Sequence, residues 1–178
     1  SCSLVGSEMC IRDRHSSAAI AAYPELGCTG DMLEVPHRWG VFKDIYCAGK
    51  EETFVFLEEV LDEVVQLFPG PRIHIGGDEA PKVRWEECPL CQARMKEEGL
   101  ANEEELQRWF IGRMGRYLAT KGKTIIGWDE ILEGGLPEGA AVQSWRGMEG
   151  AAEGVHLGAD VVVSPTSHCY LDLSLIHI

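Results

Sequence analysis

Apolar side chains recur along two long stretches of the chain at the spacing of an amphipathic helix. The first stretch, residues 52–67, places Leu57, Val60, Leu61, Val64 and Val65 on one helical face. The second predicted helix runs from Asn102, a suitable N-cap, to Lys121, with Gly122 as its C-cap. Its expected buried face consists of Leu106, Trp109, Phe110, Arg113, Met114 and Tyr117.

Short apolar runs alternate with these helices and predict strands. The four runs are 72–75, 124–127, 141–144 and 160–163. Other stretches predict a short helix within 15–27, a polar loop over 81–101 and a helix over 148–157. Strands that alternate with helices form a parallel sheet, so the predicted fold class is α/β. Four strands would make half of a (β/α)8 TIM barrel.

Polar and aromatic residues follow each predicted strand. The first strand runs into Gly76-Gly77-Asp78-Glu79, and the next two end in Trp128-Asp129-Glu130 and Trp145-Arg146-Gly147. The last strand is followed by a segment that contains Tyr170 and Asp172. In a (β/α)8 barrel the active site lies at the C-terminal ends of the strands. The two glycines permit a tight turn, which would let Asp78 and Glu79 reach one pocket.

Composition narrows the class of partner. The 178 residues are 45% apolar and 25% charged, which is typical of a globular domain. The net charge of -13 argues against nucleic acid or an anionic membrane as a partner. No apolar run is long enough to span a bilayer, and no glycine-rich phosphate motif is present.

Seven cysteines are present, and Cys88 and Cys91 form the one CxxC pair. A zinc site would need a second pair, or two histidines at suitable spacing, and no nearby stretch supplies them. We therefore expect a loop disulfide or buried thiols at this pair, and no metal ligands.

Carboxylates combined with several aromatic rings suit a sugar ligand. Aromatic faces stack on the apolar CH surfaces of a sugar, and carboxylates bind hydroxyls or transfer protons. Each residue also has a structural interpretation: a tryptophan is often part of a core, and Tyr170 and Asp172 could be surface residues. His74 alternates with two isoleucines, which indicates a hydrogen-bonded core histidine.

Five motifs together resemble glycoside hydrolase family 20, the β-N-acetylhexosaminidases. They are HSSAAIAAYPELGCTG, HIGGDEAPKVRW, GWDE, QSWRG and YLD, which occur in the family's order between residues 15 and 172. The resemblance implies hydrolysis of terminal, non-reducing β-GlcNAc or β-GalNAc from an oligosaccharide or glycoconjugate, without a cofactor. It also implies an extracytoplasmic or lysosome-like location.

The resemblance assigns roles to individual residues. Glu79 matches the general acid/base, and Asp78 matches the carboxylate that holds the substrate's acetamido group. The residues matched to sugar binding are Trp128, Trp145, Tyr170 and Asp172. His15 matches a histidine that supports the acid/base, and we expect His74 to lie in the same supporting layer.

The adjacency of the two carboxylates fits this family's chemistry. A retaining glycosidase with a protein nucleophile needs its carboxyl groups about 5 Å apart on opposite sides of the sugar. Two neighbouring residues on one turn are poorly placed for that. Substrate assistance removes the need, because the acetamido oxygen attacks the anomeric carbon and retention follows through an oxazoline.

The resemblance fails at both ends of the chain. Asp13-Arg14 stand where the family has Pro-Gly, and the match stops at Asp172. We therefore expect a non-native leader over 1–14, a partial catalytic barrel over 15–172 and a non-native tail over 173–178. The family's early strands and its last strand find no match, so we expect this chain by itself to be inactive.

Two alternatives from other classes are open. One is a metal-dependent barrel enzyme whose oxygen ligands are Asp78, Glu79, Asp129 and Asp172. Loss of activity with a chelator would favour it. The other is a non-catalytic sugar-binding remnant, which would bind the sugar without turnover.

Overall fold

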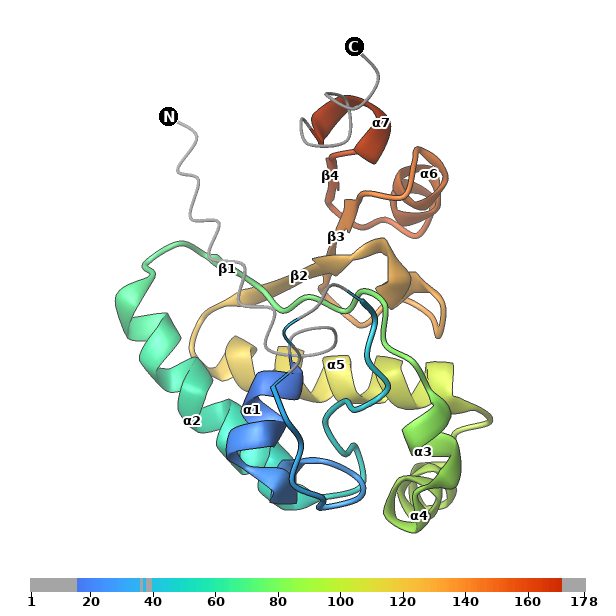
Figure 1. The fold of residues 1–178 in the computed structure, drawn as a ribbon. Coiled ribbons are helices and arrows are strands. Elements are labelled where there is room, and N and C mark those ends of the chain that lie inside the picture. Colours follow the sequence, from blue (N-terminus) through green and yellow to red (C-terminus); the bar gives the residue numbers. More distant parts are fainter. Residues whose placement is uncertain (1–15, 36, 38–39, 171–178) are drawn as a thin grey trace.

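The structure is a computed structural model that describes residues 16–35, 37 and 40–170 (Figure 1). In chain order its elements are α1 (Ser16–Ala22), η1 (Pro24–Leu26), α2 (Glu51–Leu67), β1 (Arg72–His74), α3 (Val83–Glu87), α4 (Pro89–Glu98), α5 (Glu103–Thr120), β2 (Thr124–Trp128), η2 (Asp129–Leu132), β3 (Ala141–Ser144), α6 (Glu149–His156), β4 (Val161–Val163) and α7 (Thr166–Cys169). No helix in these ranges is both long and apolar enough to cross a membrane.

The four strands form one sheet in the order β1-β2-β3-β4. Every neighbouring pair is parallel, with Ile73 opposite Ile125, Gly127 opposite Val142, and Gln143 opposite Val162. The predicted α/β class and its parallel sheet are confirmed. Since the strands all run the same way, the residues that follow them gather at one edge of the sheet (Figure 1).

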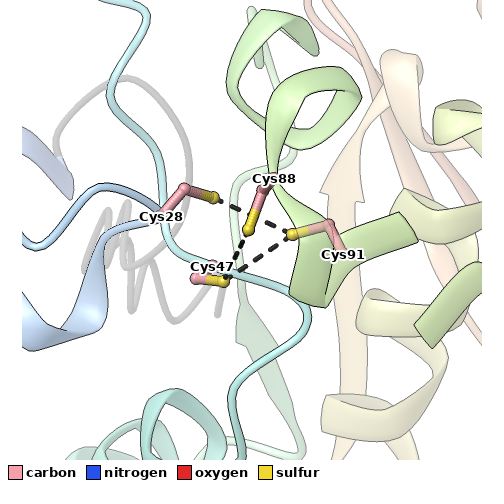
Figure 2. Close-up of side chains that lie close together, drawn as sticks. All are labelled: Cys28, Cys47, Cys88 and Cys91. Carbon is pink, nitrogen blue, oxygen red and sulfur yellow. Dashed lines mark hydrogen bonds between the residues drawn. The ribbon is translucent and has the colours of Figure 1, made fainter. Parts of the chain in front are cut away.

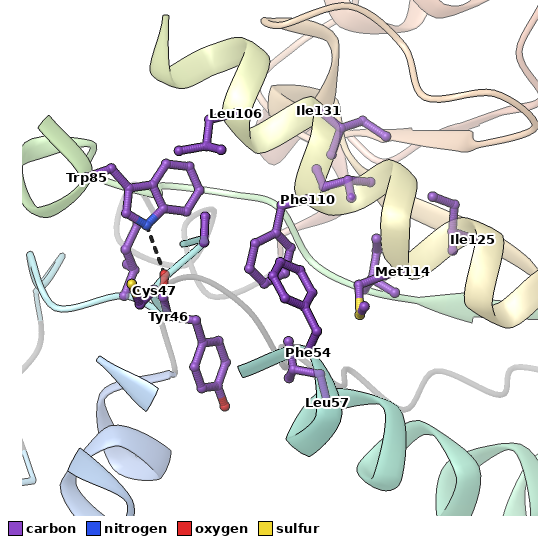
Figure 3. Packing of buried hydrophobic residues seen from close by; sticks show 14 of the residues in the cluster. Tyr46, Cys47, Phe54, Leu57, Trp85, Leu106, Phe110, Met114, Ile125 and Ile131 are labelled. Carbon is purple, nitrogen blue, oxygen red and sulfur yellow. Dashed lines mark hydrogen bonds between the residues drawn. The ribbon is translucent and has the colours of Figure 1, made fainter. Parts of the chain in front are cut away.

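The main core lies between α2, α5 and the first two strands (Figure 3). Phe54 of α2 packs against Phe110 of α5 with ring centroids 4.7 Å apart. The fully buried side chains include Leu57, Leu61, Leu106, Ile111, Met114 and Leu118. Large apolar side chains buried between helices and sheet supply most of the stability of such a layer. The sheet edge with its polar residues is thereby held on a rigid support.

The buried face of α5 differs from the predicted one at Arg113. The buried residues of this helix are Leu106, Gln107, Phe110, Ile111, Met114 and Leu118. Arg113 lies at the border, where its guanidinium covers the Phe54 ring at 3.9 Å and donates to the Glu51 carboxylate at 2.6 and 2.9 Å. Its alkyl stem covers apolar surface while its charge stays near water, which explains its place on the periodic stripe.

The predicted polar loop over 81–101 is wrong. This stretch forms α3 and α4, with Pro89 in the first turn of α4 and Gly99 in the left-handed conformation at its end. Both are standard helix-end residues. Only Cys91 and Met95 of α4 are buried, so the helix has almost no apolar stripe and its periodicity cannot be detected in the sequence.

The predicted N-cap of α5 is confirmed, and its C-cap is Lys121, one residue before the predicted Gly122. Asn102 Oδ1 accepts a hydrogen bond from the Glu105 N–H at 2.9 Å, as an N-cap should. Gly122 has a φ of 71° and its N–H donates to the Ala119 carbonyl at 3.0 Å, which closes the C-terminal end.

Candidate active site

The turn after β1 depends on its two glycines. Gly76 and Gly77 have φ values of 77° and 106°, which side-chain-bearing residues rarely adopt. A Cβ on Gly77 would lie 2.6 Å from Ile131 Cγ2, so any other residue would also force the Ile131 side chain to move. Glu79 follows with a φ of 46° and is the one non-glycine residue with positive φ among the described residues. Backbone strain of this kind is concentrated at functional sites.

Gln107 holds this turn from α5. Its side chain is only 3% exposed, and its Nε2 donates to the Gly77 carbonyl at 2.9 Å. Lys82 donates from Nζ to Gln107 Oε1 and, at 3.0 Å, to the Ala80 carbonyl. The amide and the ammonium therefore fix the backbone on both sides of Asp78 and Glu79. Sequence reasoning missed Gln107, although a polar residue on the same helical face as Ile111 and Met114 was the available signal.

Replacing Gln107 by leucine should destabilise the chain by about 1–3 kcal/mol, because the buried Gly77 carbonyl then has no donor from α5. Thermal unfolding measures this loss. The matched control is Arg108→Leu, an exposed neighbour on the same helix, which should change the unfolding temperature little. Equal effects of the two substitutions would contradict the role given to Gln107.

A row of rings runs across the C-terminal ends of the four strands. The His74 and Trp128 ring centroids are 4.9 Å apart, those of Trp128 and Trp145 are 6.5 Å apart, and those of Trp145 and Tyr170 are 6.5 Å apart. Trp128 is buried but lies outside the main hydrophobic cluster. The structure thus brings together the three aromatic residues predicted from the sequence as one continuous apolar wall.

His74 is a neutral histidine in this wall. Its Nδ1 accepts a hydrogen bond from the Gly76 N–H at 3.1 Å, so the ring proton resides on Nε2. Burial lowers the pKa of His74 to about 4. The expectation of a hydrogen-bonded histidine is confirmed, and its contact with Gly76 ties the wall to the glycine turn.

Two buried carboxylates behind the wall received no sugar-binding role from the sequence. Trp145 donates from Nε1 to both carboxylate oxygens of Glu130, at 3.0 and 3.2 Å, which orients the indole. Burial raises the pKa of Glu130 to about 7. Asp129 is 1% exposed and accepts from Ser144 Oγ at 3.3 Å and from Arg146 Nε at 3.1 Å. Asp129 and Glu130 directly follow Trp128 in the sequence, and this position could have indicated that they support the aromatic wall.

His74 and Glu130 should have opposite effects on the pH dependence of stability. The folded-state pKa of His74 is lowered, so its contribution is present above pH 6.5 and is lost as the pH falls toward 4. The folded-state pKa of Glu130 is raised, so the folded chain binds a proton at Glu130 more readily than the unfolded chain does. The free energy of unfolding therefore rises as the pH falls below 7. In the Glu130→Gln variant only the His74 titration remains of the two. The free energy of unfolding of this variant should therefore fall by about 2 kcal/mol between pH 7 and pH 5. His74→Asn should gain stability over the same interval.

Urea unfolding of both variants at the two pH values measures these slopes. The unsubstituted chain serves as the reference and should lie between them, because there the two effects oppose each other. Parallel slopes in the two variants would contradict the titration assigned to these groups.

An open cleft of about 480 Å³ lies beside the glycine turn. Its lining includes Gly77, Glu79, Lys82, Gln107, Glu130, Trp145 and Arg146. Glu79 and Trp145 thus share one cleft, and Asp78 is the residue next to it on the turn. His15 and Asp172 lie outside the described residues.

The arrangement does not match the metal-dependent alternative. Within the described ranges, the group of side chains that could hold a metal consists of four cysteines, and the carboxylates of Asp78, Glu79 and Asp129 do not converge. Asp129 is engaged instead with Ser144 and Arg146. What converges at the strand ends is an acidic turn with an aromatic wall, a combination that suits a sugar ligand at the place where barrel enzymes carry their active sites.

Comparison with known families agrees with this class. The model of the glycosyl hydrolase family 20 catalytic domain matches residues 14–176. The chain therefore belongs to glycoside hydrolase family 20, as its motifs indicated.

Individual relatives show how much of the family architecture the chain contains. A β-hexosaminidase of Porphyromonas gingivalis is 50% identical over 159 residues, which are 89% of this chain and 20% of the relative. The solved β-N-acetylhexosaminidase of Bacteroides fragilis is 37% identical with a TM-score of 0.77, covering 86% of this chain and 31% of that one. A Vibrio harveyi exo-β-N-acetylglucosaminidase, solved with N-acetylglucosamine, is 31% identical with a TM-score of 0.70. The match covers 83% of this chain and 24% of that one.

The chain spans only 20–33% of the length of the first relatives it matches. The solved relatives are TIM-barrel enzymes, so the four parallel strands form part of a (β/α)8 barrel. This confirms the predicted fold class.

Proposed function

We propose that this chain supplies the catalytic face of a β-N-acetylhexosaminidase, which releases terminal non-reducing β-GlcNAc and β-GalNAc from oligosaccharides or glycoconjugates. The observation that carries the proposal is the strained turn that presents Asp78 and Glu79 together, with Glu79 in the same cleft as Trp145. The names of the Porphyromonas gingivalis and Vibrio harveyi relatives support this activity, and the latter was solved with N-acetylglucosamine.

The proposed mechanism is substrate-assisted. Family 20 is a known exception to the use of two opposed carboxylates, and retention there comes from the substrate's own acetamido group. The acetamido oxygen attacks the anomeric carbon as the glycosidic bond breaks, which gives an oxazolinium intermediate. Water then attacks the same carbon from the face that the leaving group vacated, and the acetamido group is restored.

The two carboxylates have separate tasks in this scheme. Glu79 gives its proton to the glycosidic oxygen as the aglycone leaves, and then takes a proton from the attacking water. Asp78 remains ionised and stabilises the positive charge that develops on the acetamido nitrogen. Gln107 and Lys82 position both through the backbone that they bind.

The aromatic wall provides the sugar-binding surface. Trp128 and Trp145 stand with their rings at 72° to one another, which gives two sides of a pocket rather than one flat platform. Tyr170 extends the row with a hydroxyl that can donate to the acetamido carbonyl. The proposed pocket is apolar around the acetamido methyl group and polar at its carbonyl.

The test uses a chimaera, because the chain corresponds to one part of a longer relative. The 159 matched residues of the Porphyromonas gingivalis enzyme are replaced by those of this chain. We expect hydrolysis of an aryl N-acetyl-β-glucosaminide, with the β-anomer as first product by NMR and inhibition by a thiazoline mimic of the oxazoline. A folded chimaera that gives the α-anomer first, or binds without turnover, would overturn the proposal.

A further inference from the structure

Four cysteines that are distant in the sequence meet at one point of the fold (Figure 2). Cys28 follows η1, Cys47 precedes α2, and Cys88 and Cys91 stand at the start of α4. Their sulfur atoms all lie within 4.8 Å of one another. Cys47 and Cys91 are fully buried, Cys88 is 5% exposed, and Cys28 is half-buried. Burial of four thiols around one point needs a physical explanation.

The backbone around the cluster is built to bring these sulfurs together. An antiparallel bridge joins Gly27 to Tyr46, and the Cys47 N–H donates to the Leu26 carbonyl at 2.8 Å. Lys50 Nζ donates to the carbonyls of Glu25 and Gly27 at 2.8 and 2.7 Å, which fixes the segment before Cys28.

Close backbone packing places Cys88 and Cys91 beside Cys47. A Cβ on Gly49 would lie 2.2 Å from the Leu90 carbonyl carbon, so only glycine lets the Cys47 segment lie against the turn between Cys88 and Cys91. Trp85 of α3 donates from Nε1 to the Tyr46 carbonyl at 2.9 Å, which also fixes the backbone beside Cys47 (Figure 3).

The sulfur spacing fits a single tetrahedral ion. Four sulfurs at the usual Zn–S distance of about 2.3 Å stand about 3.8 Å apart along the edges of the tetrahedron. The Sγ–Sγ distances are 3.8 Å for Cys28–Cys91, 3.8 Å for Cys47–Cys88 and 3.7 Å for Cys47–Cys91. A disulfide would bring two sulfurs to about 2.05 Å, and all four cysteines are free.

We propose that Cys28, Cys47, Cys88 and Cys91 bind one Zn²⁺ ion in a tetrahedral, structural site. The four ligands bind as thiolates, so their protons are released to solvent when the ion enters. With four protein ligands the ion has no open position for substrate, so its role is to hold the fold.

Cys88 and Cys91 are free and buried, which is one of the two states expected for the CxxC pair, and the structure adds Cys28 and Cys47 beside them. The second pair of ligands lies 41 and 60 residues before Cys88, so it was not found by inspecting nearby sequence. The ion would join the segments before α2 to α3 and α4, the helices that follow directly after the Asp78–Glu79 turn. It is a separate site from the proposed catalytic cleft.

The first test is the metal content of the 178-residue chain after production with zinc and removal of free metal. Mass spectrometry of the elements should find about one zinc per chain, and Cys91→Ser should lower this at least about tenfold. The matched control is Cys169→Ser, which changes an exposed cysteine outside the cluster and should keep the zinc. A zinc-free chain, or equal zinc in both variants, would overturn the proposal.

Two further measurements do not depend on how well the variants fold. Alkylation in denaturant with a chelator and no reductant should label all four cysteines of the cluster. If the four cysteines stayed unlabelled because they form two disulfides, the proposal would be overturned. Titration of the reduced, unsubstituted chain with Co²⁺ should give the intense visible absorption of tetrahedral thiolate coordination, and the absence of that absorption would overturn the site. Iron in place of zinc in the purified chain, with the colour of an iron–thiolate centre, would overturn the assignment to zinc.

Discussion

Glu79→Gln in the chimaera should lower kcat by about 10²–10⁴-fold on substrates with poor leaving groups. Such substrates need a proton on the glycosidic oxygen, and glutamine cannot provide one. Aryl glycosides with acidic phenols leave without help, so the first step on them should be slowed much less. The measurement is kcat/KM across a series of aryl N-acetyl-β-glucosaminides of increasing phenol pKa.

The slope of that series decides the role of Glu79. The parent chimaera should show a shallow dependence on phenol pKa and the Glu79→Gln variant a steep one. An azide nucleophile should restore turnover of the most reactive substrate, because azide needs no general base. If the variant kept the parent slope, Glu79 would not be the acid.

Asp78→Asn should slow all members of the same series by a similar factor, of order 10²–10⁴. The carboxylate acts on the acetamido nitrogen rather than on the aglycone, so the identity of the phenol should not matter. Asparagine keeps the size of the side chain but cannot compensate the positive charge on the oxazolinium.

The two carboxylates thus serve as controls for each other. They are adjacent on one turn and are both half-buried, so a general disturbance of that turn would affect both slopes alike. A steep slope for Asp78→Asn, or the same slope in both variants, would contradict the division of roles.

Local periodicity explains why the sheet and the two long helices could be predicted. The stripe of α2 and the short apolar runs of β1 to β3 are strong signals that the tertiary structure does not override. α3 and α4 could not be predicted in this way, because α4 buries only two side chains. Its stability comes from contacts with distant segments.

The same distinction applies to the site. Asp78, Glu79, Trp128, Trp145 and Tyr170 follow predicted strands, so a parallel sheet was enough to place them at one edge. Gln107 and Glu130 act through hydrogen bonds to the Gly77 backbone and to the Trp145 indole, and these depend on packing between elements. The cysteine cluster depends on a bridge between Gly27 and Tyr46 that no local pattern reveals.

The most direct test of the central claim is the dependence of turnover on the acetamido group. The chimaera is assayed for kcat/KM on a nitrophenyl N-acetyl-β-glucosaminide and on the matching β-glucoside, which lacks that group. Substrate assistance predicts turnover of the first and a loss of at least about 10²-fold on the second, since the internal nucleophile is absent. Equal kcat/KM values on the two substrates would contradict the account.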